Sequence, residues 1–312
     1  MSTAVFLELV EIRTKVASFF PFILGVLYAG YYFQSFQLIN TVLFFLAMII
    51  FDMATTAINN TMDYVKAKNI TYQQQENILG KANLSVKKVT LLIIAMIGTA
   101  SLLGLLLTYR TNLLLLVMGI ICFLIGIFYT FGPFPISRMP LGEVLSGLTM
   151  GFGIFFIAVF VNVPVGQLAG FQLSWPMFTL TGNIQTVLIV FLQSIPIVCT
   201  IANIMLSNNL CDLETDISNH RYTLTYYIGK TAAIKLYAIL YYVAYFSITL
   251  AVLLRVSPIW MIAVWLTFPI VQRNIKRFSA VQEKATTFSL AIKNLVIIHS
   301  LQIILLILGI IF

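Results

Sequence analysis

Charged residues are scarce in this chain, because Asp, Glu, Lys and Arg together make up 9% of its 312 residues. Soluble globular domains carry about 25%, so the composition excludes an ordinary soluble protein. Hydrophobic residues reach 60%, and apolar runs near twenty residues recur along the whole length. A run of about 20 residues crosses the hydrocarbon core of a membrane as a helix. The runs are continuous rather than alternating, which favours a helical bundle over a transmembrane barrel.

Cysteine is also rare, and its distribution argues against a disulfide-stabilised fold. The chain has only Cys122, Cys199 and Cys211, which are scattered and odd in number. Two of them lie in apolar runs, where a cysteine behaves as a small buried hydrophobic residue. We therefore expect three free thiols and no disulfide.

The N-terminus lacks the positive start of a signal peptide. Glu8 and Glu11 both precede the first basic residue, whereas a signal peptide begins with positive charge before a short apolar core. We expect the first span to remain in the mature protein. No stretch has the composition of a soluble domain, and the longest outer loop, 164–185, is expected at the membrane surface. The prediction is one membrane domain over residues 1–312.

The apolar runs predict an all-α, polytopic membrane bundle of about nine transmembrane helices. The eighth run is short; Pro258 is expected to begin it and Pro269 to kink it. The predicted spans are 16–33, 41–58, 89–108, 113–131, 144–163, 186–206, 232–254, 259–272 and 290–312.

The basic residues indicate the orientation of this bundle. With the N-terminus inside, sixteen of the 18 Lys and Arg residues fall in inner segments, and only Arg110 and Arg255 fall outside. Cytoplasmic loops of membrane proteins carry such an excess of Lys and Arg. The sequence predicts an integral, multi-pass protein of a bacterial cell membrane, with its N-terminus in the cytoplasm and its C-terminus outside. The net charge of +8 suits an anionic leaflet or an anionic substrate.

All ten acidic residues fall in inner segments or at inner ends of spans, and the first notable group follows the second span. It lies in the stretch DMATTAINNTMDYVKAKN, residues 52–69. If the helix continues inward, Asn59 and Asp63 share a face at i, i+4. Asn60 reaches Asp63 at i, i+3, and Asp52 extends the same stripe.

The second group follows the sixth span, in the stretch NNLCDLETDISNHRYTLTYYIGK at 208–230. Asn208, Asp212 and Asp216 are spaced to lie on one helical face, with Glu214 on another. Two carboxylates on one face repel each other, and a bound divalent cation reverses the sign of that interaction. Asp and Asn oxygens suit Mg²⁺, which accepts substrate phosphates as its remaining ligands.

Basic residues follow each acidic group. Lys66, Lys68 and Lys81 come after the first group, and Arg221 and Lys230 come after the second. Carboxylates that bind a metal, followed by cations that bind anionic oxygens, indicate a site for Mg²⁺ and a diphosphate.

The two groups also repeat one pattern. Asn59 and Asp63 are separated by three residues, as are Asn208 and Asp212, and the two pairs are offset by 149 positions, about half the chain. This spacing predicts two pseudo-repeated helical halves that face one central cavity.

These motifs resemble those of a known family. NNLCDLETD, followed by RYTL and IG, resembles the second aspartate-rich motif of UbiA-type intramembrane prenyltransferases, and NNTMD resembles their first. RTKVASFFPFILG at 13–25 is similar to their first span. YTFGPFPISRMPLGEVLSGLTMGFG at 129–153 resembles the branch that prenylates 1,4-dihydroxy-2-naphthoate in menaquinone biosynthesis. The residues that carry this last match are Tyr129, Gly132, Pro133, Pro135, Gly142 and Glu143.

The first motif departs from the family pattern. The family has N-D-x-x-D where this chain has N-N-T-M-D at 59–63, so Asn60 stands where a carboxylate is usual. An amide oxygen still ligates a hard cation, but it brings no charge. Asp52 is a candidate to compensate.

The resemblance implies transfer of a polyprenyl group from its diphosphate to an aromatic acceptor, with Mg²⁺ as cofactor. Asp63, Asp212 and Asp216 are then the catalytic aspartates. The implied metal ligands are these three and Asn59, Asn60 and Asn208. The residues implied to bind the diphosphate are Arg13, Lys66, Lys81 and Arg221. Those implied to bind the acceptor or the prenyl group are Tyr129, Glu143 and Asp52.

The expected partners are therefore a polyprenyl diphosphate, an aromatic acceptor and the lipid bilayer, with no nucleic acid and no obligate protein partner. A prenyltransferase for another acceptor, such as 4-hydroxybenzoate or haem, remains an alternative within the family. A transporter with repeated halves and midplane charges is the alternative from another class. The carboxylates lie at the inner boundary rather than at the midplane, which counts against the transporter.

Overall fold

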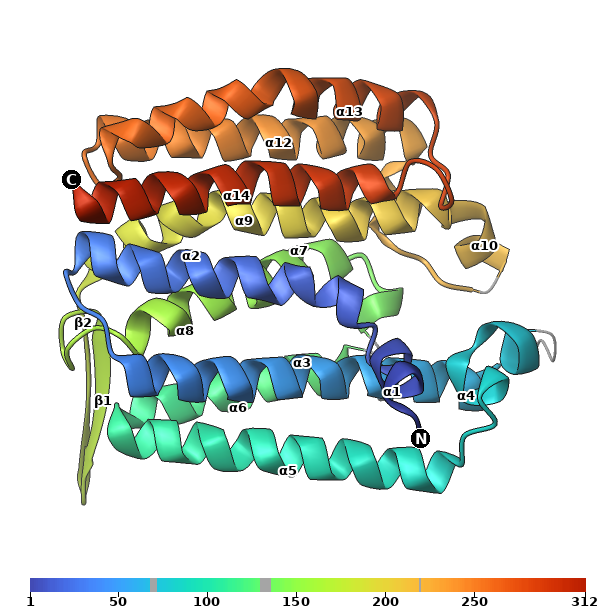
Figure 1. The fold of residues 1–312 in the computed structure, drawn as a ribbon, viewed down its shortest axis with the longest axis horizontal. Helices are drawn as coiled ribbons and strands as arrows, with labels where there is room; N and C mark the ends of the chain where they lie inside the picture. The colour runs from blue at the N-terminus through green and yellow to red at the C-terminus, as the bar shows by residue number, and fades with distance from the viewer. Residues whose placement is uncertain (68–71, 130–135, 219) are drawn as a thin grey trace.

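The computed structural model describes residues 1–67, 72–129, 136–218 and 220–312 as a bundle of long helices lying side by side (Figure 1). Lys68, Gly132, Pro133, Pro135 and the end of the predicted fourth span lie outside the described residues. The elements are α1 Thr3–Leu9, η1 Ile12–Lys15, α2 Val16–Tyr32, α3 Leu38–Lys66, η2 Tyr72–Glu76, α4 Ile78–Lys81, α5 Val86–Arg110, α6 Leu113–Phe128, η3 Ile136–Arg138, α7 Gly142–Ser146, η4 Gly147–Gly153, α8 Ile154–Phe160, β1 Ala169–Ser174, β2 Met177–Gly182, α9 Ile184–Cys211, α10 Leu213–Ser218, α11 Leu224–Ile228, α12 Lys230–Leu253, η5 Ile259–Thr267, α13 Phe268–Ala280 and α14 Ser289–Ile311.

The membrane class is confirmed, whereas the number of spans stays a prediction. Within the described part of the chain, seven helical segments are long and apolar enough to cross a membrane. They are Ile12–Tyr32, Leu38–Lys66, Val86–Arg110, Gly142–Phe160, Ile184–Cys211, Lys230–Leu253 and Ser289–Ile311. The other two predicted spans correspond to α6, which has only 16 residues, and to the successive elements η5 and α13.

The predicted eighth span changes its helix type near its proline. Pro258 is the N-cap of the 3-10 helix η5, as expected. Pro269 does not kink a continuous helix but lies in the first turn of α13, at the junction between the two elements. A proline is tolerated there because the first turn of a helix leaves its N–H groups unpaired in any case.

The helices of both aspartate groups extend beyond the apolar runs. α3 continues through Asp63 to Lys66, as the i, i+4 spacing required. α9 ends at Cys211, and α10 begins at Leu213 after a break at Asp212. The Asp216 N–H still donates to the Asp212 carbonyl at 2.7 Å. Both groups, with the N-terminus, lie at the right-hand end of Figure 1, and the C-terminus lies at the opposite end.

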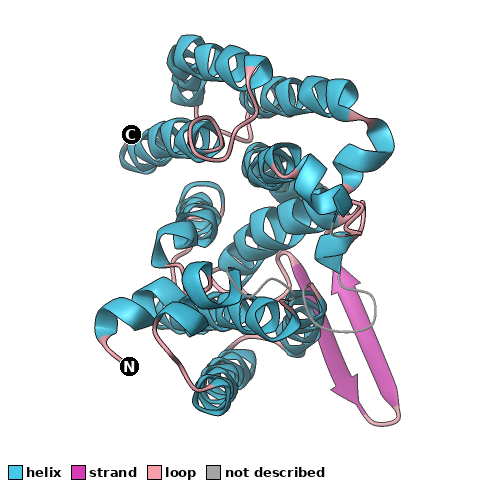
Figure 2. Cartoon of the chain, turned by 90° about the vertical axis from the view of Figure 1, so that its right-hand side faces the viewer, coloured by secondary structure: helices cyan, strands magenta, loops and turns pink. Residues whose placement is uncertain are grey.

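The predicted outer loop 164–185 contains structure that the sequence did not indicate. β1 and β2 form an antiparallel hairpin in which Ala169 pairs with Gly182 and Ser174 pairs with Met177. Figure 2 shows this hairpin projecting beyond the helices. Asn112 anchors its base, because its side-chain oxygen caps α6 and also accepts a hydrogen bond from the Phe171 N–H at 2.8 Å. The helical class therefore holds for the bundle, with one small hairpin added.

Close packing fixes the helices that surround the centre. A Cβ at Gly25 of α2 would lie 2.6 Å from the Phe155 carbonyl oxygen, so only glycine permits this approach of α2 to α8. His299 is fully buried in this core and lies 2.7 Å from the Thr200 hydroxyl and 2.5 Å from the Gln302 oxygen. Both of its ring nitrogens therefore have a partner inside the bundle. All three cysteines are free, as predicted.

Candidate active site

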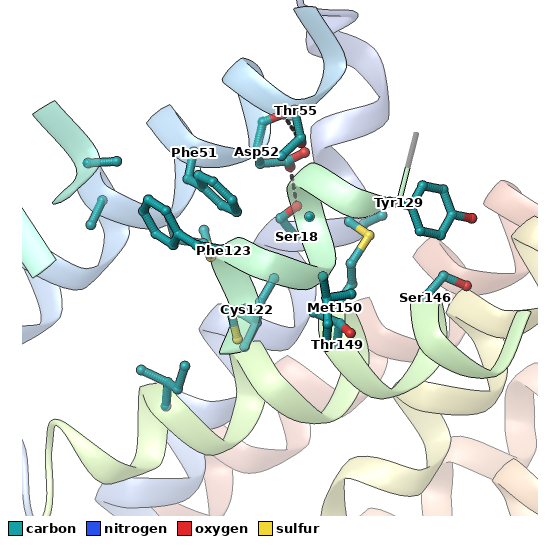
Figure 3. Close-up of a pocket in the computed structure, with 18 of the residues that line it drawn as sticks. Ser18, Phe51, Asp52, Thr55, Cys122, Phe123, Tyr129, Ser146, Thr149 and Met150 are labelled. Carbon is teal, nitrogen blue, oxygen red and sulfur yellow. Dashed lines mark hydrogen bonds between the residues drawn. The ribbon is translucent and has the colours of Figure 1, made fainter. Parts of the chain in front are cut away.

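Two adjoining cavities lie within the bundle. The larger, of about 670 Å³, is lined mainly by apolar side chains from α2, α3, α5, α6 and η4 (Figure 3). The smaller, of about 410 Å³, lies nearer the end that holds the aspartate groups and is more polar. The two share lining residues, which are Ala17, Asn59, Tyr129, Ser146, Met150, Ile204, Met205 and Phe288. We call them the apolar cavity and the inner cavity.

The wall of the apolar cavity is built for a long hydrocarbon. Phe51 of α3 stacks on Phe123 of α6 with ring centroids 3.9 Å apart. The lining continues along these helices to Phe44 and Leu115. From Phe44 to Asn59 the cavity follows sixteen residues of α3, and the fifteen steps between them correspond to about 22 Å of helix.

One polar cluster interrupts this apolar wall. The Lys15 ammonium donates to the Asp52 carboxylate at 2.8 Å, to the Asp52 carbonyl at 3.1 Å and to the Thr56 hydroxyl at 2.6 Å. The Ser18 hydroxyl donates to the second Asp52 carboxylate oxygen. All three ammonium protons are therefore used. The structure places Asp52 in this cluster, on the cavity wall, rather than in a pair with Asp63.

The inner cavity brings together six residues that the sequence marked out. They come from α3, from the end of α6, from α9 and from the loop after α10. They are Asn59, Asp63, Lys66, Tyr129, Asn208 and Arg221. Arg13, another of the predicted cations, lines the apolar cavity. Tyr129 lines both cavities, with its hydroxyl 3.6 Å from the Met205 sulfur.

Asp216 is held beside the inner cavity by Arg221. The Asp216 side chain is buried, with one carboxylate oxygen 3.5 Å from the Arg221 guanidinium. Its other oxygen, Oδ2, is buried without a hydrogen-bond partner. Burial raises the pKa of Asp216 above its ordinary value, and the nearby Arg221 opposes that rise. A buried carboxylate oxygen with no donor is an available ligand for a cation.

Arg221 connects the two halves of the site. Its Nε donates to the Ser137 carbonyl at 3.1 Å, which fixes the guanidinium against the segment after α6. Both Arg221 and Arg138 lie within electrostatic range of Asp63 and of Asp216. Two guanidinium groups beside both aspartates create a positive region between the two motifs, as an anionic substrate requires.

Asn208 and Asp212 already share a cation. The Lys284 ammonium, from the loop between α13 and α14, donates to Asn208 Oδ1 and lies 2.5 Å from Asp212 Oδ2. The sequence placed Asn208 and Asp212 on one face, and the structure shows both oxygens turned toward one positive charge.

Five predicted site residues do not line either cavity. Two of them, Asp212 and Asp216, are paired with Lys284 and Arg221 as described above. The other three lie elsewhere. Lys81 lies 3.9 Å from Glu8 in an exposed ion pair. Glu143 is buried and accepts a hydrogen bond from Asn209 at 2.8 Å, an arrangement that stabilises the packing of α7 on α9. Asn60 points toward α1, where its amide donates to the Leu9 carbonyl at 2.9 Å.

The position of Asn60 yields a prediction for Asn60→Asp. A carboxylate cannot donate to the Leu9 carbonyl, and it would lie beside Glu11, which Asn60 contacts at 3.3 Å. An unpaired acceptor costs about 1–3 kcal/mol, so we expect the variant to have a lower melting temperature. Because Asn60 points toward α1, we expect the half-saturating Mg²⁺ concentration to stay unchanged. A thermal scan checks the first expectation, and a Mg²⁺ titration on membranes, compared with wild type, checks the second. A lower half-saturating Mg²⁺ concentration in the variant would show instead that Asn60 faces the metal.

The site residues fit a magnesium ion by their chemistry. Within the described ranges, no three His, Cys, Asp or Glu side chains converge closely enough to hold a metal by themselves. The available ligands are instead carboxylate and amide oxygens, which Mg²⁺ accepts together with waters and substrate phosphates. The unpartnered Asp216 oxygen and the ammonium bound between Asn208 and Asp212 both mark positions that favour a cation.

Sequence reasoning missed Ser137, Arg138 and Lys284 as parts of the site. Arg138 lies in the stretch 129–153 that matched the family, so that match was the signal that pointed to it. Lys284 is 72 residues from Asp212 and carries no motif. Only the fold brings it to the second aspartate group.

Comparisons with known proteins show which family the chain is related to. A model of the UbiA prenyltransferase family matches residues 18–296. Over 278 residues the chain is 30% identical to the 1,4-dihydroxy-2-naphthoate octaprenyltransferase of Bacillus subtilis (strain 168), with 87% of this chain and 81% of that protein covered.

Solved structures share the fold. An apo UbiA homologue from Aeropyrum pernix K1 superposes with a TM-score of 0.66 at 18% identity, covering 94% of this chain and 98% of that one. A UbiA homologue from Archaeoglobus fulgidus, solved with GPP and Mg²⁺ bound, gives a TM-score of 0.64 at 15% identity, covering 99% and 100%. With the motifs, the cavities and the family match in agreement, the chain belongs to the UbiA prenyltransferase family.

Proposed function

We propose that the protein transfers a polyprenyl group from polyprenyl diphosphate to 1,4-dihydroxy-2-naphthoate, with loss of CO₂, in menaquinone biosynthesis. The observation that carries the acceptor is the 30% identity to a relative named for this reaction. The geometry supports the reaction class, because an inner cavity rich in carboxylates and cations adjoins a long apolar cavity. The whole chain, 1–312, acts as one domain in this proposal.

Two groups of oxygens would hold the metal. Asn59 and Asp63 line the inner cavity from α3, and Asn208 lines it from α9. Asp212 and Asp216 follow Asn208 by one and two turns of chain. Mg²⁺, when bound, neutralises the diphosphate leaving group. A metal held by both groups would keep the diphosphate end of the substrate beside the two aspartate motifs.

The cations of the inner cavity bind the diphosphate oxygens. Arg221 is fixed by the Ser137 carbonyl and by Asp216, so its guanidinium is oriented before substrate arrives. Lys66 and Arg138 line the same cavity. Guanidinium groups bind phosphate oxygens in pairs with defined geometry, so Arg221 and Arg138 set the direction in which the leaving group departs.

Tyr129 lies where the two cavities meet. When the bond between the allylic carbon and the diphosphate oxygen breaks, positive charge develops on that carbon. An aromatic face within reach stabilises such a charge, and the apolar wall of Phe51 and Phe123 keeps water from capturing it. The prenyl tail lies along the apolar cavity.

The acceptor completes the reaction without a further reagent. The ring carbon that bears the carboxylate forms a bond to the allylic carbon. The electrons of the bond between ring and carboxylate then return to the ring as CO₂ leaves. The charges balance, because a carboxylate and an allylic cation give two neutral products.

The reaction takes place, in this proposal, on the cytoplasmic side of a bacterial cell membrane. Reporter fusions after Lys88 and after Lys230 should both report a cytoplasmic location. Each position lies at the start of a helix, directly after a segment that carries an aspartate group and several basic residues. An external reading at either position would place the two motifs on opposite sides and rule out a shared metal site.

An acceptor panel tests the function. Membranes that contain the protein are supplied with Mg²⁺, a labelled polyprenyl diphosphate and one acceptor at a time: 1,4-dihydroxy-2-naphthoate, 4-hydroxybenzoate or haem. We expect a prenylated product with the naphthoate. A product only with one of the other acceptors would overturn the acceptor assignment. If polyprenyl diphosphate is not consumed with any of the three acceptors, the reaction class itself would be wrong.

A further inference from the structure

Lys284 contacts two oxygens that the metal site needs. Its ammonium donates to Asn208 Oδ1 and lies 2.5 Å from Asp212 Oδ2. Asn208 lines the inner cavity, and Asp212 follows it by one turn of helix. A single positive charge is thus held between the amide and the carboxylate that were identified as metal ligands.

The loop that carries Lys284 is held by local hydrogen bonds and leads to Phe288 in the cavity wall. Gln282 closes its start by donating to the Phe278 carbonyl at 2.6 Å, and the Glu283 N–H donates to the Thr287 hydroxyl at 2.9 Å. The Lys284 ammonium lies 5.3 Å from the centroid of the Phe288 ring, and Phe288 lines both cavities. A lysine that left Asp212 would therefore remain next to a residue of the cavity wall.

The contact is weak enough to exchange. The Lys284 side chain is 50% exposed and the Asp212 side chain 29% exposed, and ion pairs of such exposure contribute little to stability. The ion pair between Lys15 and Asp52 is the opposite case, with side chains 7% and 16% exposed and all its donors used. A dication with waters and phosphate oxygens as further ligands competes well against one half-exposed ammonium.

We propose that Lys284 is a built-in counter-cation of the second aspartate motif. It holds Asn208 and Asp212 while no metal is bound, and it gives them up when a divalent cation and a diphosphate enter. The released ammonium then binds an oxygen of the diphosphate. This inference rests on the proposed function, because the ligands that Lys284 vacates belong to the proposed metal site.

The exchange has an electrostatic reason. Without a cation, Asp212 and Asp216 repel each other across one turn of chain, and each is then stabilised by its own basic residue, Lys284 and Arg221. A divalent ion replaces the charge of Lys284 and frees it. The leaving group gains negative charge as the reaction proceeds, so a released ammonium at the cavity mouth stabilises the products of bond cleavage more than the substrate.

Metal affinity without substrate tests the proposal. The full-length protein in detergent is titrated with Mn²⁺, and the signal of free Mn²⁺ is followed by electron paramagnetic resonance. Lys284→Gln removes the competitor, so we expect Mn²⁺ to bind about 1.5- to 5-fold more tightly, from the usual strength of exposed ion pairs. Lys284→Arg keeps the charge and should not tighten binding. Lys230→Gln, an exposed lysine near the same motif, controls for net charge.

The outcomes separate this inference from the metal site itself. If wild type binds Mn²⁺ and Asp216→Asn weakens that binding, the metal site stands. Unchanged affinity in Lys284→Gln, or the same gain in Lys230→Gln, would then overturn the role of Lys284 alone. If wild type binds no Mn²⁺, the metal site and the exchange fail together.

A second measurement uses the wild-type chain, so it does not depend on how a variant folds. An amine-reactive reagent labels exposed lysines, and mass spectrometry compares Lys284 with Lys230. We expect Mn²⁺ to raise the labelling of Lys284, because the ammonium loses Asp212. Inorganic pyrophosphate added with Mn²⁺ should lower it again. The exchange would be contradicted if Mn²⁺ left the labelling of Lys284 unchanged, or if pyrophosphate did not lower that labelling.

Discussion

Replacing Asp216 by alanine is expected to lower the rate of prenyl transfer by about 10²–10⁴, which corresponds to several kcal/mol of lost transition-state stabilisation. The loss is large because a buried carboxylate with an unpartnered oxygen is removed from beside Arg221. The effect should fall on the chemical step, where the leaving group gains charge. Single-turnover rates in membranes, with saturating Mg²⁺, measure it.

Glu214 provides the matched control. It lies two residues earlier on the same short helix, but its side chain is exposed rather than buried. Glu214→Ala should therefore keep most of the activity. Equal losses in the two variants would show that the charge of the segment matters rather than the position of Asp216. Activity in wild type that a chelator leaves unchanged would argue against the metal altogether.

Lys15→Met is expected to have the largest effect on stability. The variant leaves the Asp52 carboxylate on the cavity wall without its ammonium partner, although Ser18 still donates to it. Removing one partner of a buried ion pair costs about 3–5 kcal/mol. The chain should unfold at a clearly lower temperature in detergent, which a thermal scan of the purified protein detects.

The double variant Lys15→Met with Asp52→Leu separates the ion pair from simple packing. Replacing both partners by apolar side chains removes the uncompensated charge, so the double variant should recover most of the lost stability. If the two single losses simply add, the pair contributes no coupling. Asp52 would then have a role of its own in the cavity.

The spacing of polar residues predicted the inner cavity well, because it depends on local helix geometry. Asn59 and Asp63 share a face whenever α3 continues inward, and the helix does so as far as Lys66. Asn208 was predicted from the same kind of spacing, whereas Arg221 was predicted as a basic residue that follows the second acidic group. Both line the cavity with Asp63. The N- and C-terminal ends lie at opposite ends of the bundle (Figure 1), as a predicted odd number of spans requires.

Contacts between distant segments could not be predicted in this way. Asn60 has an i, i+3 relation to Asp63, and this spacing was compatible with a side chain that faces the metal. In the structure the Asn60 amide instead donates a hydrogen bond to the Leu9 carbonyl of α1. Lys284 was one of many inner lysines until the loop after α13 placed it against Asp212. The break in the helix at Asp212, between α9 and α10, likewise had no signal in the i, i+4, i+8 spacing.

The central claim is that the two aspartate groups and the apolar cavity together carry out a decarboxylating prenyl transfer. It is tested most directly with purified protein in lipid nanodiscs and 1,4-dihydroxy-2-naphthoate that carries a carbon label in its carboxyl group. We expect labelled CO₂ and prenylated product in equal amounts, and neither when polyprenyl diphosphate or Mg²⁺ is omitted. Prenylated product that retains the label, or no product under the complete conditions, would contradict the account.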